Sequence, residues 1–470
     1  MKKNLTRIWL LLPLLLLGGI FTACSSDDGE TSSGGEEDGT MRRTVLVYLI
    51  SENDLNNVVD YDIEEILYAS RAGSIPQDCN VIVYNDGVDM PSITLYNKKK
   101  SKVLKTWKQD QNSADSTVML QVLHEMVEYA PAEHYSLVLW SHGDGWMPTL
   151  ETQKQQYARL QKELLEEMQE QRTNRRAFGI DNGLNDDSED GDYDMNISSV
   201  KWVLEKLDIH LDYLLWDACF MQTIEVAYEL RKQTDWVIGS PAEASAYGAP
   251  YTTAAKALCN ADIEGVMKTY KDFYSRLTDV PTFPFSAVKT SELQALADAT
   301  APLIVKYFSD TMPEGEKDAQ VYSDRNIITE PEDDGSCYIT GPIRYDMGSL
   351  MHKVLTPEEY TQWRPLLDKA VPYKLTPSEH WGLSNDPITY YNTLQDPDHY
   401  SGISMNVPQQ QYDFYLFNDT NRYCYLGWNT YFKNSFSWWT AGGWADTGLD
   451  ETDIFAVKYL ANYFMERYKL

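Results

Sequence analysis

The chain has 470 residues, of which 43% are hydrophobic and 12% aromatic, so it can bury one large core or two smaller ones. The 71 Asp and Glu residues outnumber the 40 Lys and Arg residues, and the net charge is −31. This balance argues against nucleic acid as a partner, because phosphate binding needs clustered cations, whereas a cationic substrate would be attracted.

The first predicted element is a targeting segment over residues 1–23. Basic residues precede an apolar run that is too short for a comfortable spanning helix, and small residues follow it. Because the small residues directly before Cys24 resemble the bacterial lipoprotein box, we expect lipid on Cys24; an ordinary secretory signal is the alternative. Residues 24–41 are rich in Ser, Gly and acidic residues, which predicts a flexible tether. We therefore expect a lipid-anchored protein of the bacterial cell envelope, in the outer membrane or at the cell surface.

Buried strands and amphipathic helices alternate over the following 200 residues. Apolar runs predict strands at 43–50, 79–86, 135–143, 211–219 and 234–244, and periodic patterns predict helices at 58–70, 116–130, 197–207 and 221–233. Residues 93–109 are expected to form a hairpin. Alternation of apolar strands with helices indicates an α/β fold with a mainly parallel sheet covered on both faces.

A charged, helix-prone insertion at 152–177 interrupts the alternation, and an acidic loop at 181–194 follows it. The loop nearly matches a calcium-binding EF-hand loop, although its twelfth position is Ile197 where a bidentate glutamate is needed. A solvated acidic loop is the alternative, and we expect no required cofactor, with calcium left open. The candidate calcium ligands are Asp186, Asp190 and Asp192.

The chain changes character at about residue 290. A helical segment at 291–310 is followed by shorter elements and an aromatic-rich tail. This composition predicts a C-terminal α+β lobe over 291–470, after a main domain over 42–290.

Two of the predicted strands end in reactive side chains, His142 and Cys219. A thiol nucleophile needs a base, and imidazole suits that task. Because sites in parallel sheets form beyond the carboxyl ends of the strands, the pair predicts one active site, although the sequence leaves open whether the two strands are neighbours. The backbone N–H groups at Gly143 and Cys219 are candidate donors to an oxyanion.

Asp217 lies two residues before Cys219, so its side chain projects to the same side of the sheet. A carboxylate there disfavours a thiolate unless it faces a cationic group of the substrate. Asp217 is therefore a candidate for recognising Arg or Lys, and Ser240 and Glu243 are candidates for lining the same pocket.

Four blocks of this chain resemble the clostripain family of cysteine peptidases, within the caspase, gingipain and legumain group. They are "YLISENDLNN", "SHGDGW", "DACFMQTIEVAYEL" and "SPAEASAYGAPY", in family order, and "YDMGSLM" and "SGISMNVP" extend the likeness further. The resemblance implies a caspase-like fold, with His142 as general base and Cys219 as nucleophile. It also implies that Asp217 is the acidic residue in the pocket for a basic side chain.

Members of this family are often made as single chains and cut once between the His and Cys strands. The 152–177 insertion lies in that position, which implies self-cleavage there, although the insertion is longer than expected. The candidate cut sites follow Arg172, Arg175 and Arg176.

These observations predict an exported cysteine endopeptidase that cuts peptide or protein substrates after Arg or Lys. A non-catalytic surface lipoprotein, binding glycan or protein through its 13 Trp and 32 Tyr, is the first alternative. A hydrolase with two catalytic carboxylates is the second, but acidic residues are so abundant here that such a pair has no specificity. The intact His–Cys pair favours the peptidase.

Overall fold

The computed structural model describes residues 41–87, 89–147, 178–181, 193–245, 247–277, 283–309, 313–322, 344–381, 391–408, 414–417, 422–425 and 428–448. From Thr40 onwards the chain forms one compact unit. None of the described helices is both long and apolar enough to cross a bilayer. Several predicted sites lie outside the described residues: Cys24, Arg172, Arg175, Arg176, Asp186, Asp190 and Asp192.

A nine-stranded sheet organises the described part of the chain, in the order β12-β10-β9-β8-β5-β1-β2-β3-β4. Its strands are β1 (Met41–Ile50), β2 (Cys79–Asp86), β3 (Ser92–Asn97), β4 (Lys100–Thr106), β5 (Ala132–Trp140), β8 (Leu211–Asp217), β9 (Trp236–Gly239), β10 (Phe285–Lys289) and β12 (Tyr373–Leu375). The five central strands from β9 to β2 are parallel, and antiparallel strands flank them on both sides. The predicted mainly parallel sheet and the predicted hairpin at 93–109 are both confirmed.

The strands that lead to His142 and Cys219 are neighbours. β5 and β8 run parallel, and Trp140 pairs with Asp217 at their carboxyl ends. Because both strands end at that edge of the sheet, the two reactive residues that follow them lie on the same side of the fold. The structure thus answers the question that the sequence left open.

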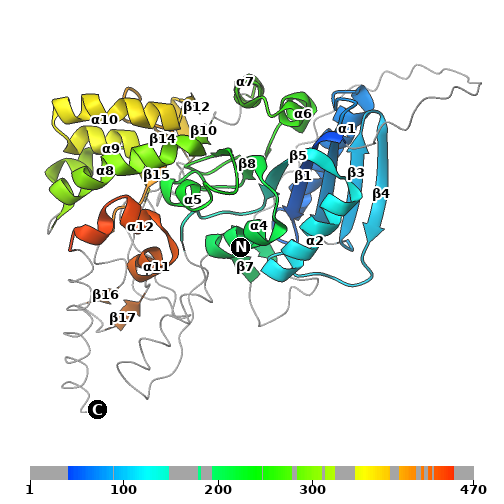
Figure 1. Ribbon diagram of the computed structural model, residues 1–470, viewed down its shortest axis with the longest axis horizontal. Coiled ribbons are helices and arrows are strands. Elements are labelled where there is room, and N and C mark those ends of the chain that lie inside the picture. Colours follow the sequence, from blue (N-terminus) through cyan, green and yellow to red (C-terminus); the bar gives the residue numbers. More distant parts are fainter. Residues whose placement is uncertain are drawn as a thin grey trace, which may run out of the picture. The chain divides into compact units, whose positions relative to one another are not determined.

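Helices cover both faces of the sheet (Figure 1). The helices that precede residue 290 are α1 (Asn56–Ala72), α2 (Ser116–Tyr129), α4 (Ile197–Leu207), α5 (Ile224–Glu229), α6 (Tyr251–Asn260) and α7 (Ile263–Tyr274). On one face α1 packs beside α6 and α6 beside α7, and on the other α2 packs beside α4. Alternate residues of β8 enter the two cores, with Tyr213 and Leu215 in one and Leu214 and Trp216 in the other.

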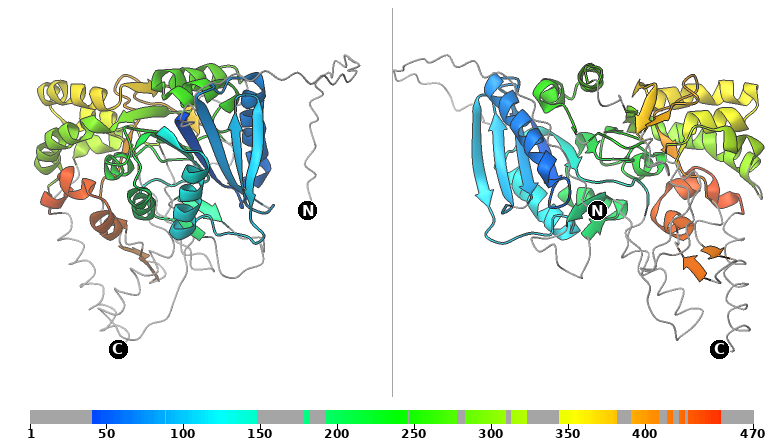
Figure 2. Two further views of the ribbon diagram at one scale, coloured as in Figure 1. Left: turned by 45° about the vertical axis from the view of Figure 1, so that its right-hand side comes forward. Right: turned by 180° about the vertical axis from the view of Figure 1, so that it is seen from behind.

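The residues after 290 share the central sheet, because β12 pairs with β10. Their helices are α8 (Leu293–Phe308), α9 (Met347–Val354), α10 (Pro357–Ala370), α11 (Trp428–Ser435) and α12 (Trp438–Ala441), with 3₁₀ turns at Thr290–Glu292, Glu314–Asp318 and Trp444–Asp446. In the views of Figure 2 the yellow helices of this segment lie at the end of the sheet away from the blue strands.

Four small two-stranded sheets complete the described structure. They pair β6 (Phe178–Asp181) with β7 (Tyr193–Met195), β11 (Tyr345–Asp346) with β15 (Ser404–Met405), β13 (Glu379–Trp381) with β14 (Tyr391–Thr393), and β16 (Phe414–Phe417) with β17 (Arg422–Tyr425). An isolated bridge also joins Thr223 to Ser404, so the segment after Cys219 is tied to the C-terminal part of the chain.

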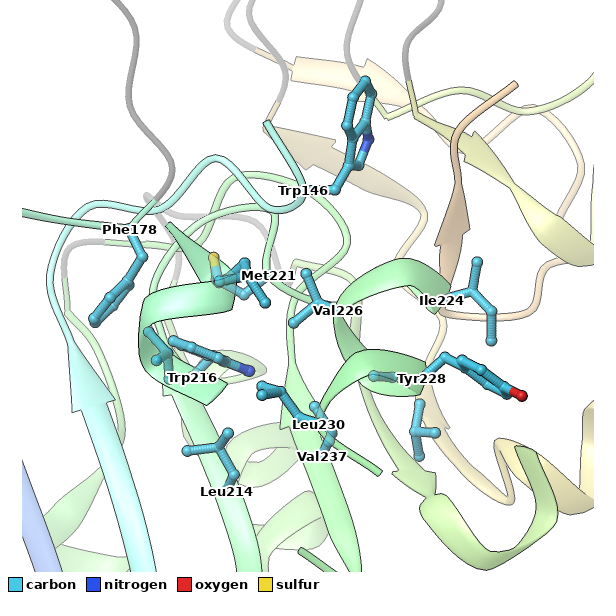
Figure 3. Packing of buried hydrophobic residues seen from close by; sticks show 14 of the residues in the cluster. Trp146, Phe178, Leu214, Trp216, Met221, Ile224, Val226, Tyr228, Leu230 and Val237 are labelled. Carbon is cyan, nitrogen blue, oxygen red and sulfur yellow. The ribbon is translucent and has the colours of Figure 1, made fainter. Parts of the chain in front are cut away.

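The floor of the predicted site is a packed apolar layer. Figure 3 shows Met221 near Trp216 and Phe178, with Val226 on the adjoining α5 helix. The rings of Phe178 and Trp216 meet edge to face with centroids 4.9 Å apart. Thr223, four residues after Cys219, caps α5 by accepting a hydrogen bond from the Val226 N–H. The helix is shorter than the helix predicted at 221–233, since it begins at Ile224 and ends at Glu229.

Candidate active site

His142 is held by an acidic side chain from the opposite loop. Its Nε2 lies 2.5 Å from Oδ1 of Asp54, which is in the segment between β1 and α1. The imidazole is 24% exposed and the Asp54 side chain 77% exposed, so the pair lies at the surface of the sheet edge. The His142 carbonyl also accepts a hydrogen bond from the Gly179 N–H at 3.0 Å, which ties the backbone of this residue to β6. A carboxylate on Nε2 orients the ring and stabilises an imidazolium.

The Cys219 thiol contacts the loop between β9 and α6. Its sulfur accepts a hydrogen bond from the Ala244 N–H at 3.3 Å, and Cys219 as a whole residue is partly exposed. Burial raises the pKa of Cys219 to about 12, although the Ala244 N–H opposes that shift. In the part of the chain that the structure describes, no hydrogen bond joins Cys219 to His142. The thiol is therefore protonated in this arrangement.

The backbones of Gly143 and Cys219 touch. A Cβ atom at Gly143 would lie 2.6 Å from the carbonyl oxygen of Cys219 and 2.8 Å from the Met221 sulfur, which is closer than a side chain permits. Phe220 follows with a φ of +59°, and its N–H donates to the Ala242 carbonyl at 2.9 Å. This left-handed turn bends the chain sharply after Cys219 and occupies the Phe220 N–H. Only glycine fits at position 143.

Asp217 is one member of a pair of acidic side chains, and Asp62 is the other. Its Oδ2 accepts hydrogen bonds from the Ala249 N–H at 2.9 Å and from the Tyr251 hydroxyl at 3.3 Å. A Cβ at Gly248 would lie 3.1 Å from Asp217 Oδ2 and 3.2 Å from Oδ1 of Asp62 on α1, so the two carboxyl groups lie close together on one side of this glycine. Burial raises the pKa of both acids, and the Asp217 charge raises that of Asp62 further. This pair of carboxyl groups is suited to binding a cation, which would take the place of the protons that burial favours.

The loop from Ser240 to Pro250 connects the nucleophile to this acidic pair, since it supplies Ala244 to Cys219 and Ala249 to Asp217. Ser240 itself is 1% exposed, and its hydroxyl donates to the Ala242 carbonyl at 2.9 Å. Glu243 is half-buried, and its charge contributes to the raised pKa of Cys219. Both residues therefore belong to the loop that faces the site, Ser240 within its turn and Glu243 near the thiol.

Arg344 fastens the residues after His142 to the C-terminal segment. It is 2% exposed, forms an ion pair with Asp144, and donates to the Asp144 carbonyl at 3.0 Å. Its guanidinium carbon lies 4.1 Å from the centre of the Phe220 ring. One cation thus braces the residues that follow both His142 and Cys219.

Sequence reasoning missed Asp62, Asp54 and Arg344. Asp62 carried a detectable signal, because it occupies the buried stripe of α1 between Val59 and Ile66, where an apolar residue is expected. Asp54 lies within the block "YLISENDLNN", but nothing in that block links it to His142, and Arg344 lies far along the chain from both catalytic residues.

Comparisons with known proteins identify the family and the fold of this chain. A sequence profile of the clostripain family matches residues 47–161 and 167–356. None of the curated proteins compared with the chain matches it.

Two solved structures share the fold. A secreted C11 cysteine protease from Bacteroides thetaiotaomicron, in complex with an irreversible peptide inhibitor, is 23% identical, with a TM-score of 0.63 over 86% of this chain and 99% of that one. An inactive zymogen C11 protease from Parabacteroides distasonis is 24% identical, with a TM-score of 0.62 over 86% of this chain and 98% of that one. Since the family profile covers well over half of the sequence, the chain belongs to the clostripain family and is a cysteine peptidase.

Proposed function

We propose that this peptidase is an exported, lipid-anchored endopeptidase that cleaves peptide or protein substrates after Arg or Lys. The observation that carries the specificity is the pair of carboxyl groups, Asp217 and Asp62, that lie beside each other at Gly248. Cys219 is the nucleophile and His142 the general base. The bonds of the β9–α6 loop to both Cys219 and Asp217 support a basic side chain bound beside the thiol.

The reaction proceeds by acyl transfer. His142 takes the thiol proton, the sulfur attacks the substrate carbonyl, and the imidazolium returns the proton to the leaving amine. Because Nε2 is bonded to Asp54, Nδ1 is the ring nitrogen that serves Cys219. Water then hydrolyses the thioester. The N–H groups of Gly143 and Cys219, two residues whose backbones lie close together, are the donors that stabilise the oxyanion in this proposal.

In this proposal the chain is inactive as a peptidase until it is cut between the His and Cys strands. Two features support latency: the pKa of Cys219 is raised to about 12, and among the described residues no hydrogen bond joins His142 to the thiol. A cut between the His and Cys strands, after Arg172, Arg175 or Arg176, would release the 152–177 insertion and let the imidazole approach the sulfur. The basic residues of the insertion are the type that the acidic pair would accept.

The proposed location of the protein in the cell envelope is supported by the sequence of its first residues. The basic, apolar and small-residue order of residues 1–23 supports export, and Cys24 in its lipoprotein-like context supports a lipid anchor in the outer membrane or at the cell surface. In this proposal the anchor is the contact with the membrane.

A panel of fluorogenic peptides that differ at the residue before the scissile bond tests the activity. Wild-type protein should cleave the Arg and Lys members, and Cys219→Ala should cleave none while keeping the wild-type circular dichroism spectrum. Preference for Asp or for large apolar residues would overturn the specificity, and turnover by Cys219→Ala well above background would overturn the mechanism.

A further inference from the structure

Two buried cysteines, Cys79 and Cys259, lie against each other at the amino end of the parallel strands, the edge of the sheet opposite the active site. Cys79 is the first residue of β2, and Cys259 is in the last turn of α6. Both are 0% exposed and belong to the same hydrophobic core. Their thiols share a hydrogen bond. Because the two residues are far apart in the sequence, tertiary structure alone brings them together.

Two arginines hold the end of α6 beside β2. The carbonyl oxygen of Cys259 accepts hydrogen bonds from the guanidinium groups of Arg43 at 3.0 Å and Arg42 at 3.3 Å. Arg43 is the residue that pairs with Cys79 between β1 and β2, and the Arg42 N–H donates to the Asp78 carbonyl at 3.0 Å. Since the last carbonyls of a helix have no partner within it, these bonds fix the helix end. The backbone therefore places the two thiols in contact.

The surroundings of the two thiols favour neither a metal site nor catalysis. Among the described residues, the groups of three or more side chains that could hold a metal ion contain neither cysteine. The nucleophile Cys219 is placed elsewhere, against the β9–α6 loop. The hydrogen bond with Cys79, together with burial, raises the pKa of Cys259, so this thiol stays protonated in the folded chain. The chemistry open to two touching thiols is a disulfide bond.

We propose that Cys79 and Cys259 form a disulfide bond when the chain is exported. This inference rests on export, which is part of the proposed function, because disulfides form and persist in oxidising compartments outside the cytosol. Two sulfurs that share a hydrogen bond need only a small further approach to reach the bonding distance of about 2.05 Å.

The oxidant is the disulfide of another molecule, such as a thiol–disulfide oxidoreductase of the cell envelope. The thiolate of one cysteine attacks that disulfide and forms a mixed disulfide, and the thiolate of the second cysteine then displaces the oxidant. The two cysteines lose two protons and two electrons, and the oxidant takes up both to become a dithiol. Because both thiols are fully buried in the fold, this exchange takes place before α6 packs on the sheet.

The bond would span the segment that we propose is cut. The 152–177 insertion lies between Cys79 and Cys259 in the sequence, so a cut there leaves one cysteine on each fragment. The proposed lipid on Cys24 belongs to the first fragment, whereas the nucleophile Cys219 belongs to the second. A disulfide between the fragments would therefore keep the nucleophile covalently attached to the membrane anchor after maturation.

Peptide mapping tests the bond directly. The full chain with Cys219→Ala, exported by a bacterial host, is unfolded and alkylated with iodoacetamide before any reduction. A digest should contain a pair of peptides linked through Cys79 and Cys259, lighter by two hydrogen atoms than the separate peptides and lost on reduction. Alkylation of both cysteines in protein from the envelope fraction would overturn the proposal, and so would linkage of either one to Cys337 or Cys424.

A parallel sample makes the test independent of export. The same protein is reduced, unfolded and refolded in a mixture of oxidised and reduced glutathione, which supplies the oxidant. The same linked peptides should form, and free thiols at both positions would overturn the proposal. The cell fraction that contains the protein reports on export separately, so failure of export and failure of the bond are distinguishable.

Thermal unfolding separates a covalent bond from simple packing. Cys79→Ala, Cys259→Ala and the double variant should each lower Tm by roughly 3 °C or more. Because either single change breaks the bond, each should lower Tm nearly as much as the double change does. Two thiols that only pack against each other would give decreases that add, and this result would overturn the proposal.

The link between the fragments is tested on wild-type protein by denaturing electrophoresis. Without a reductant the two fragments should migrate together, and with a reductant they should separate. In the Cys79→Ala variant they should separate without a reductant. Cut wild-type fragments that separate without a reductant would overturn the link. Uncut wild-type protein would contradict self-cleavage, which belongs to the proposed function, while the peptide map still decides whether the bond exists.

Discussion

Recognition of Arg or Lys by Asp217 should depend on pH in a way that recognition of an uncharged side chain does not. Burial raises the pKa of Asp217 from 3.8 to about 6 in the free enzyme. Since the protonated acid cannot pair with a cation, its contribution is present above pH 6 and lost below it. The fraction of ionised Asp217 falls about 10-fold between pH 7 and pH 5, which corresponds to about 1.4 kcal/mol.

The measurement is kcat/KM for matched peptides with Arg or an uncharged residue before the scissile bond, since kcat/KM reports the pKa values of the free enzyme. The ratio of the two values should fall about 10-fold from pH 7 to pH 5 in the wild type. Changes in the Cys219–His142 pair cancel in this ratio, because both substrates use the same nucleophile and base.

Asp217→Asn keeps the size of the side chain and removes its charge. We expect it to lower kcat/KM for the Arg peptide by ~100-fold, or about 2.7 kcal/mol, within the range for truncating one partner of a buried charge pair. The Arg-to-uncharged ratio should then be nearly independent of pH. A ratio that is flat in the wild type, or that keeps its slope in Asp217→Asn, would refute this account of the pocket.

Three further predictions concern the nucleophile, its support and maturation. His142→Ala should lower kcat by ~10³-fold at unchanged Tm, because the thiol then lacks its base, and normal turnover would contradict that. Gly143→Ala should lower kcat by ~10²-fold, because its Cβ must displace the Cys219 backbone; an active variant would show that the contact is not needed. Mass spectrometry should find wild-type protein cut after Arg172, Arg175 or Arg176 and Cys219→Ala uncut, with the two fragments associated; an uncut, fully active wild type would exclude activation by cleavage.

Local patterns were sufficient for seven strands of the central sheet, from β9 to β4, but not for β10 and β12, which the sequence analysis did not predict. The apolar runs at 43–50, 79–86 and 211–217 are strands because each residue must be buried on one face or the other of a covered parallel sheet. The same reasoning overestimated α5, which spans Ile224–Glu229, because residues 230–233 form turns in place of a helix.

The sequence by itself determined the family blocks, the alternation of strands and helices, and the arrival of His142 and Cys219 at strand ends, since each is encoded within a few adjacent residues. Only the tertiary structure decided that β5 and β8 are neighbours and that Asp62 lies beside Asp217. These contacts join segments tens to more than 150 residues apart. Their formation depends on how strands order and helices pack, which no short window of sequence specifies.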